Sequence, residues 1–196
     1  MHTTNGVNTH NGHEFVDLGL PSGTLWATCN VGATSPEQAG LYFAFGETTG
    51  YSAEQVEKGT KKFDSASYAA PSVSDNLTLE QDAARTFMGG KWRMPTKVES
   101  KELIGNCDVT WTNDYNGTGV AGKVFTSKIN GNSVFLPAVG YCFGSTFYNM
   151  DSYGLYWSAS WRSSFRAWYL YFGSGDQGLI NGGRYFGQPV RGVCER

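Results

Sequence analysis

The segment AWYLYFG near the C-terminus alternates with the period of a β-strand. Successive side chains of a strand point to opposite faces of its sheet. Trp168, Leu170 and Phe172 are therefore expected on one face, and Tyr169 and Tyr171 on the other. If the first face packs into a core, the second presents tyrosines to solvent. Tyrosines exposed beside serine, glycine, asparagine and arginine are typical of binding surfaces, so the segment favours recognition over catalysis.

The composition favours a loop-rich, β-containing extracellular domain rather than a helical cytosolic enzyme. At 196 residues the chain has the length of one domain. Only 16% of its residues are charged, against about a quarter in soluble domains, and its 26 glycines are about twice the average usage. Residues 1–13 contain no apolar stretch and are interpreted as a flexible leader, so the ligand-binding domain is expected to span residues 14–196.

Charge and hydropathy exclude two kinds of partner. The formal net charge of −2 argues against nucleic acid, because proteins that bind it normally present a basic surface. No apolar run approaches the ~20 residues that a membrane-spanning helix needs, so no membrane span is expected in the chain.

The histidines and cysteines argue against an enzyme and against a metal site. All three histidines, His2, His10 and His13, lie in the assigned leader, so the remaining residues cannot form a Ser-His-Asp or Cys-His set. The four cysteines contain no CxxC pair, which argues against structural zinc. Buried free thiols are favoured over disulfides. We therefore expect no catalytic residue, no metal and no cofactor.

Turn and capping signals predict an α+β domain. The turn LPSG at residues 20–23 predicts a hairpin. Capping-box motifs at TLEQ (residues 78–81) and TKVE (residues 96–99) predict two helices, ended by the glycines at 89–90 and 105. Short strand-like runs separated by Asn-Gly turns follow. The expected fold therefore has two helices, small antiparallel sheets and long C-terminal loops.

Several separated motifs resemble one known family. The C-type-lectin-like domains common in surface proteins of gut bacteria are similar to this chain at VDLGLPSGTLWATCNVGA, GLYFAFGE, GGKWRMPTKVESKELI, SVFLPAVGY, YWSAS, AWYLYF and RYFGQPVRGV. A subset of that family comprises the variable proteins of diversity-generating retroelements, which occur in bacterial and phage surface proteins. The resemblance implies a C-type-lectin-like fold from about Phe15 to the C-terminus. It also implies an exposed binding site whose codons are rewritten while the scaffold stays fixed.

That resemblance implies a ligand-binding role for the heterogeneous positions between the scaffold motifs. The partner would be an unidentified protein or a surface glycan, bound by a monomer that is extracellular, on a cell surface or on a virion. The expected ligand-binding residues are Phe143, Ser145, Phe147, Tyr148, Arg162, Ser163, Ser164, Phe165, Arg166, Tyr169, Tyr171, Asp176, Gln177, Gly178, Asn181, Tyr185 and Phe186.

Two other classes of function stay open. One is a calcium-independent carbohydrate-binding adhesin module, and the other is a structural domain of a pilus or fibre. Sugar-binding C-type lectins hold calcium through EPN or QPD and WND motifs, but QPV at residues 188–190 lacks the carboxylate and WTND at residues 111–114 is interrupted, so no calcium site is expected. An oxidase of the same broad fold would need an active-site cysteine pair. Cys142 and Cys194, the only late cysteines, have no patterned histidine neighbour and are interpreted as structural.

Overall fold

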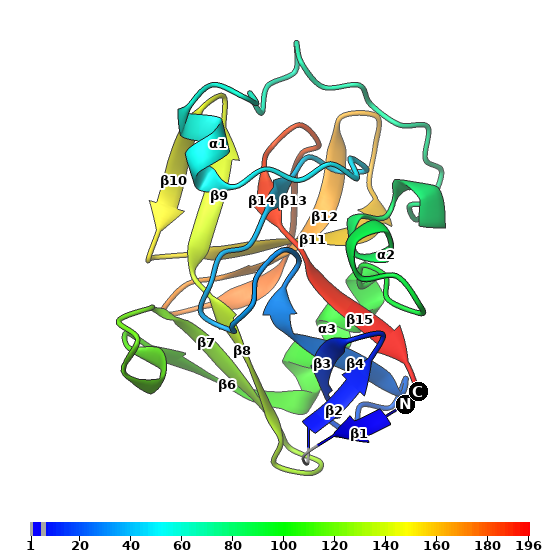
Figure 1. Cartoon of the computed structure of the whole chain (residues 1–196), viewed down its shortest axis with the longest axis vertical. Helices are drawn as coiled ribbons and strands as arrows, with labels where there is room; N and C mark the ends of the chain where they lie inside the picture. Colours follow the sequence, from blue (N-terminus) through cyan, green and yellow to red (C-terminus); the bar gives the residue numbers. More distant parts are fainter. Residues whose placement is uncertain (1, 5–6) are drawn as a thin grey trace.

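The computed structural model describes residues 2–4 and 7–196, and the chain folds around two five-stranded sheets. The first sheet gathers the N-terminal strands beside the last strand of the chain, so the two termini lie close together (Figure 1). In spatial order its strands are β1 (His2–Thr4), β2 (Val7–His10), β3 (His13–Val16), β4 (Thr24–Asn30) and β15 (Arg191–Glu195). The turn between β3 and β4 is closed by a 2.8 Å bond from the Gly23 N–H to the Leu20 carbonyl, which confirms the predicted hairpin.

The second sheet carries the C-terminal aromatic segment. In spatial order its strands are β10 (Thr146–Met150), β9 (Val139–Phe143), β11 (Gly154–Trp161), β12 (Arg166–Phe172) and β13 (Gln177–Gly183). Neighbouring strands are antiparallel except β9 and β11, which meet through a parallel bridge between Gly140 and Gly154. The AWYLYF part of this segment is therefore a strand, as its alternation predicts, and it lies in the interior of the sheet.

The remaining elements are short. A third sheet forms from β6 (Cys107–Thr112), β7 (Gly122–Ser127) and β8 (Ser133–Pro137), and β5 (Tyr42–Phe43) pairs with β14 (Gln188–Pro189). The helices are α1 (Ala53–Glu57), α2 (Ala83–Met88) and α3 (Lys97–Asn106), with 3-10 turns at Leu79–Gln81 and Tyr115–Gly117. In the described part of the chain, no helix has both the length and the apolar character needed to cross a membrane.

Apolar cores cover both faces of the second sheet at its centre. Trp157 and Tyr169 belong to the core on one face. Leu170 and Phe172 belong to the core on the other face, together with Leu103 of α3. Solvent therefore reaches this sheet mainly at its outer strands and at the strand ends.

The predicted α+β, C-type-lectin-like fold with two helices is wrong. Across residues 2–4 and 7–196 the fold is mostly β, with 41% strand, 14% helix, three α-helices and a curled five-stranded sheet. The predicted long C-terminal loops are largely the strands β11, β12 and β13. A capping box marks where a helix begins but does not indicate how long the helix is. The two motifs therefore led to an overestimate of the helical content of the fold.

The capping motifs have different outcomes. At TKVE the prediction is confirmed, because the Thr96 hydroxyl accepts the Glu99 N–H at 3.2 Å while Glu99 Oε2 accepts the Thr96 N–H at 2.8 Å. At TLEQ the same motif caps only a 3-10 turn. The Asp82 carboxylate then starts α2 by accepting the Arg85 N–H at 2.9 Å, and it also accepts the Met94 N–H at 2.8 Å. The single helix predicted there is therefore broken at Asp82.

Residues 7–13, which the sequence assigned to a leader, lie in the first sheet. His10 Nε2 accepts the Lys91 N–H at 2.8 Å, and the His10 carbonyl accepts the Trp92 indole N–H at 2.9 Å. His13 begins β3, and its ring lies edge-on to Trp92 at 6.2 Å. Two of the histidines thus belong to the folded part, contrary to the sequence interpretation. Strand pairing needs no apolar side chains, and composition therefore gives no sign of it.

Candidate ligand-binding surface

A connected cluster of exposed and half-buried rings lies at the β9–β10 edge of the second sheet, and we call it the aromatic patch. It consists of Tyr141, Phe143, Tyr148, Tyr185 and Phe186. The ring centroids are 5.4 Å apart for Tyr141–Tyr148 and Tyr141–Phe186, 5.6 Å for Phe143–Phe186 and 5.0 Å for Tyr185–Phe186. Phe143 and Tyr148 are 43% and 41% exposed. Rings at these separations support one another, so the patch is a preformed apolar platform.

Strand parity explains how β9 and β10 build their share of the patch. Tyr141 and Phe143 are two residues apart in β9 and therefore share a face, and Tyr148 of β10 lies directly opposite Tyr141. Phe147 has the other parity and packs edge-on against Tyr42 with centroids 4.9 Å apart. The prediction that Phe147 belongs to the binding surface is therefore not supported by its orientation.

Backbone bonds fix the turn that carries the other two rings. Tyr185 and Phe186 lie between β13 and β14, and the Phe186 N–H donates to the Gly183 carbonyl at 3.1 Å. Reciprocal bonds of 2.8 and 2.9 Å join Cys142 of β9 to Gly187. The turn is thus tied to the strand that carries Tyr141 and Phe143, although the two segments are far apart in the sequence.

Tyr169 is buried rather than offered to solvent, which corrects the interpretation of β12. Its side chain is 7% exposed, and its ring meets that of Trp157 edge-on at 5.6 Å. A Cβ at Gly182 would lie 3.0 Å from the Tyr169 ring and 3.6 Å from Phe186, so the glycine lets both rings approach β13. Burial also raises the pKa of the Tyr169 hydroxyl. Tyr169 therefore supports the patch from beneath.

Tyr171 is half-buried, and its side chain packs against neighbouring residues. Its ring stacks on Tyr153 at 5.4 Å. Desolvation, followed by the nearby Asp176 carboxylate, raises the pKa of Tyr171 to about 12. The turn that holds Asp176 is itself anchored, because the buried Lys123 ammonium donates to the Asp176 carbonyl at 2.8 Å and to Gln177 Oε1 at 2.5 Å. This end of β12 is a rigid corner, separate from the aromatic patch.

The turn between β11 and β12 presents a third group of predicted residues. The Ser163 hydroxyl accepts the Arg166 N–H at 3.2 Å, and the Arg184 guanidinium donates to the Ser164 carbonyl at 3.2 Å. Phe165, at the tip, is 80% exposed. Arg166 donates to Asn181 Oδ1 at 3.4 Å, on the face of β12 opposite Tyr169. Arg166 therefore does not line the aromatic patch.

The predicted site residues thus occupy more than one surface, and their burial differs. The exposed ones are Phe143, Ser145, Tyr148, Arg162, Ser164, Phe165, Arg166, Asp176 and Gln177. The half-buried ones are Phe147, Ser163, Tyr171, Gly178, Asn181, Tyr185 and Phe186. Only Tyr169 among them is buried.

Sequence reasoning missed Tyr141, Tyr153 and Ile180. Tyr141 has the same strand parity as Phe143, a signal that was present but not used. Ile180 is 39% exposed and lies opposite Tyr169 on the patch side of β13. Apart from Leu179, the residues of β13 around it are polar or glycine, so the segment has no alternating apolar pattern that would mark it as a strand.

The aromatic patch offers apolar area and neutral hydrogen-bonding groups. Its side chains are phenylalanines and tyrosines, and burial raises the pKa of Tyr141, so the phenol of Tyr141 stays protonated at neutral pH. In the hydrogen bonds of residues 2–4 and 7–196, the hydroxyls of Tyr141, Tyr148 and Tyr185 have no protein partner. They are free to bond to a ligand laid on the rings.

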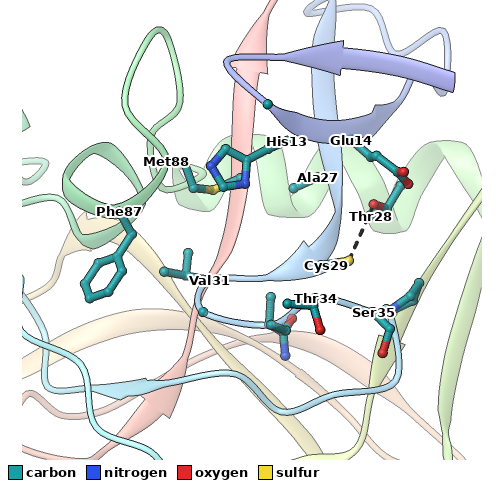
Figure 2. Close-up of a pocket in the computed structure, with 15 residues that line it drawn as sticks. His13, Glu14, Ala27, Thr28, Cys29, Val31, Thr34, Ser35, Phe87 and Met88 are labelled. Atoms are coloured by element: carbon teal, nitrogen blue, oxygen red, sulfur yellow. Dashed lines mark hydrogen bonds between the residues drawn. The ribbon is translucent and has the colours of Figure 1, made fainter. Parts of the chain in front are cut away.

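A separate pocket of about 540 Å³ lies between β3, β4, residues 32–36 and the end of α2 (Figure 2). Val31, Phe87 and Met88 supply apolar lining, and His13 also lines the pocket. Burial lowers the pKa of the His13 imidazole, so this ring is neutral at pH 7. The Cys29 thiol lies 3.7 Å from the hydroxyl of its neighbour in β4. The pocket has the size of a small-molecule site but shares no residue with the predicted surface.

Among residues 2–4 and 7–196, no group of three or more histidine, cysteine and acidic side chains lies close enough to hold a metal ion. All four cysteines are free thiols, and burial raises the pKa of Cys107 and Cys194 to about 11.

No protein-family model, no curated protein sequence and no solved structure matches the chain.

Proposed function

We propose that the chain is a ligand-recognition domain that binds a protein or a surface glycan through the aromatic patch. The observation that carries the proposal is the patch itself: five rings from separate segments pack together, yet two of them are exposed and the other three are only half-buried. Rigid aromatic side chains bury large areas at low entropic cost and dominate the binding energy of many interfaces. We propose no catalytic role for the chain.

Alanine variants of exposed patch residues test the proposal. Phe143→Ala and Tyr148→Ala should each weaken binding to a partner found by protein and glycan arrays by at least ~2 kcal/mol, or about 30-fold in Kd. Leu79→Ala and Ile129→Ala are matched controls, because these side chains are 52% and 54% exposed outside the patch. Equal affinities for patch and control variants would refute the assignment.

The same arrays separate the alternatives. A ligand on the glycan array, bound equally well in the presence of a chelator, identifies a calcium-independent adhesin module. A fibre or pilus domain would instead assemble as its concentration rises, and gel filtration over a 100-fold range would detect that (roughly 1 to 100 μM, the range of weak interfaces). We propose a monomer that acts outside the cell, on a cell surface or virion, since low charge and high Tyr, Trp, Ser and Gly content favour such a domain.

Diversification is a further part of the proposal, supported by the resemblance to the variable proteins of retroelements. Rewriting a codon is tolerated best where the side chain is exposed, because surface substitutions rarely change stability by more than ~0.5 kcal/mol. Deep sequencing of the gene in a natural population should therefore find substitutions at Arg162, Ser164 and Phe165 and find Trp157 and Leu170 unchanged. An even spread of substitutions, or none, would remove diversification and leave a fixed binding site.

A further inference from the structure

A second surface, opposite in chemistry to the aromatic patch, lies where α3 crosses β12 and β13. We call it the cationic face, and it consists of Lys97, Lys101, Arg166, Trp168 and Asn181. The Lys97 ammonium lies 5.4 Å from the centre of the Trp168 ring. Trp168 is paired with Asn181 across β12 and β13, and Asn181 accepts a 3.4 Å bond from Arg166. These contacts connect the helix and the two strands into one continuous surface.

Parity places this surface on the α3 side of the sheet. Arg166 and Trp168 alternate with Tyr169 along β12, so they point away from the aromatic patch. Lys101 follows Lys97 by one helical turn on the same side of α3. Lys97, Lys101 and Arg166 are exposed, and Trp168 and Asn181 are half-buried.

The cations of this face have no acidic partner among the described residues. The ion pairs found there involve other lysines and arginines. Both acidic residues of α3 are engaged elsewhere: Glu99 with Arg93, and Glu102 with the hydroxyl of Ser22. The helix therefore keeps its carboxylates on one side and its lysines on the other.

The placement of these lysines is unfavourable for the isolated helix. Lys97 is the first residue of α3, where the helix dipole favours an anion rather than a cation. Lys97 and Lys101 also form a like-charged i, i+4 pair, which destabilises a helix. Charged side chains that destabilise the element carrying them are expected mainly at functional sites.

We infer that the cationic face binds an anionic polysaccharide, with the three cations holding carboxylate or sulfate groups and Trp168 packing on a sugar ring once the exposed Lys97 ammonium turns from the indole to the anion. Charge complementarity requires an anionic partner. The combination of an indole ring with a side-chain amide suits a sugar, whose apolar face stacks on the ring and whose hydroxyls bond to the amide. The inference does not rest on the aromatic patch, because the two surfaces share no residue.

Affinity for two immobilised probes tests the inference: heparin, which is sulfated, and polygalacturonate, which carries carboxylates. The double variant Lys97→Gln and Arg166→Gln should lose at least ~10-fold in affinity, since each cation removed takes away a charge-assisted bond. The matched control is Lys62→Gln with Lys91→Gln, which removes the same charge from exposed positions outside this face. Dextran serves as the neutral probe.

The outcomes separate the sources of binding. Loss in the first double variant but not in the control supports the inference, and the probe that binds more tightly identifies sulfate or carboxylate as the recognised group. The inference is overturned if the protein binds neither probe, or if both double variants lose equally. Tighter binding to vesicles with anionic lipid or to duplex DNA than to either polysaccharide also overturns it. Tyr148→Ala should bind both probes normally, so failure here is distinguishable from failure of the aromatic patch.

Discussion

Replacing Tyr169 by alanine tests the burial pattern of β12 most directly, because the sequence and the structure disagree about this side chain. Its ring is 7% exposed and packs edge-on against Trp157. Removing a buried aromatic side chain costs about 3–5 kcal/mol, of which an edge-to-face pair contributes about 0.5–1.5 kcal/mol. Because the ring lies close to the surface, water can partly fill the space left behind. We therefore expect the lower part of that range, about 3–4 kcal/mol.

For a chain of this length, a loss of about 3–4 kcal/mol lowers the melting temperature by about 6–16 °C. Urea unfolding followed by tryptophan fluorescence measures the free energy, and a thermal scan measures the shift. Tyr169→Phe keeps the ring and should stay within about 1 kcal/mol of the wild type, since the shape of the core is conserved. Tyr148→Ala removes an exposed ring and should change stability by less than about 1 kcal/mol.

The opposite outcome has a clear meaning. If Tyr169→Ala melted within about 2 °C of the wild type, the ring would not be part of the core. Tyr169 would then be available to a ligand, as the alternation of β12 alone suggests. Loss of binding in this variant is informative only after its stability is known, whereas Tyr148→Ala reports on binding directly.

Three further changes test local structure. Thr96→Ala removes the capping box of α3 and should lower the unfolding free energy by about 1 kcal/mol in urea titrations. Glu99→Gln breaks the ion pair with Arg93 and should cost about 2 kcal/mol at pH 7. Burial opposes ionisation of Glu99, but hydrogen bonds from Arg93 and Thr96 hold the pKa of its carboxyl below the usual 4.5. A carboxyl with a lowered folded pKa stabilises above the unfolded pKa, so the deficit should shrink as the pH falls below about 4.5, and a pH-independent deficit would contradict this account. Lys123→Met releases Gln177 and should speed amide exchange at residues 173–177, measured by mass spectrometry; unchanged exchange would mean that other contacts hold the turn.

Local signals predicted the elements that depend on a few neighbouring residues. The hairpin at residues 20–23 follows from the turn-forming Gly23, and the start of α3 follows from the reciprocal bonds of Thr96 and Glu99. Helix ends were harder to predict. Gly105 does not end α3, because Asn106 is still helical, and the side-chain amide of Asn106 donates to the carbonyl of Glu102. The fold class could not be predicted from local signals, because it depends on pairings such as that of β4 with β15, which joins opposite ends of the chain.

The sequence predicted the surface position of most residues of the aromatic patch, but not their contacts with one another. Phe143, Tyr148, Tyr185 and Phe186 were expected at the surface, and they are exposed or half-buried. Their contacts with Tyr141 depend on bonds between β9 and the turn after β13, which no local pattern encodes.

The disagreement over Tyr169 shows what strand alternation can and cannot establish. A period of two correctly assigned Trp168 and Tyr169 to opposite faces, because that assignment depends only on backbone geometry. Whether a face is covered depends on what packs against it. On the Tyr169 side, Tyr169 and its cross-strand neighbour Trp157 both belong to a buried core, while α3 brings Lys97, rather than an apolar side chain, over Trp168. The side expected to be core thus ends in a charged, half-open surface, and the side expected to be open is closed beneath the aromatic patch. Alternation in an interior strand therefore separates two environments without saying which one faces water, and a binding site is better sought at the strand ends and outer strands, where coverage stops.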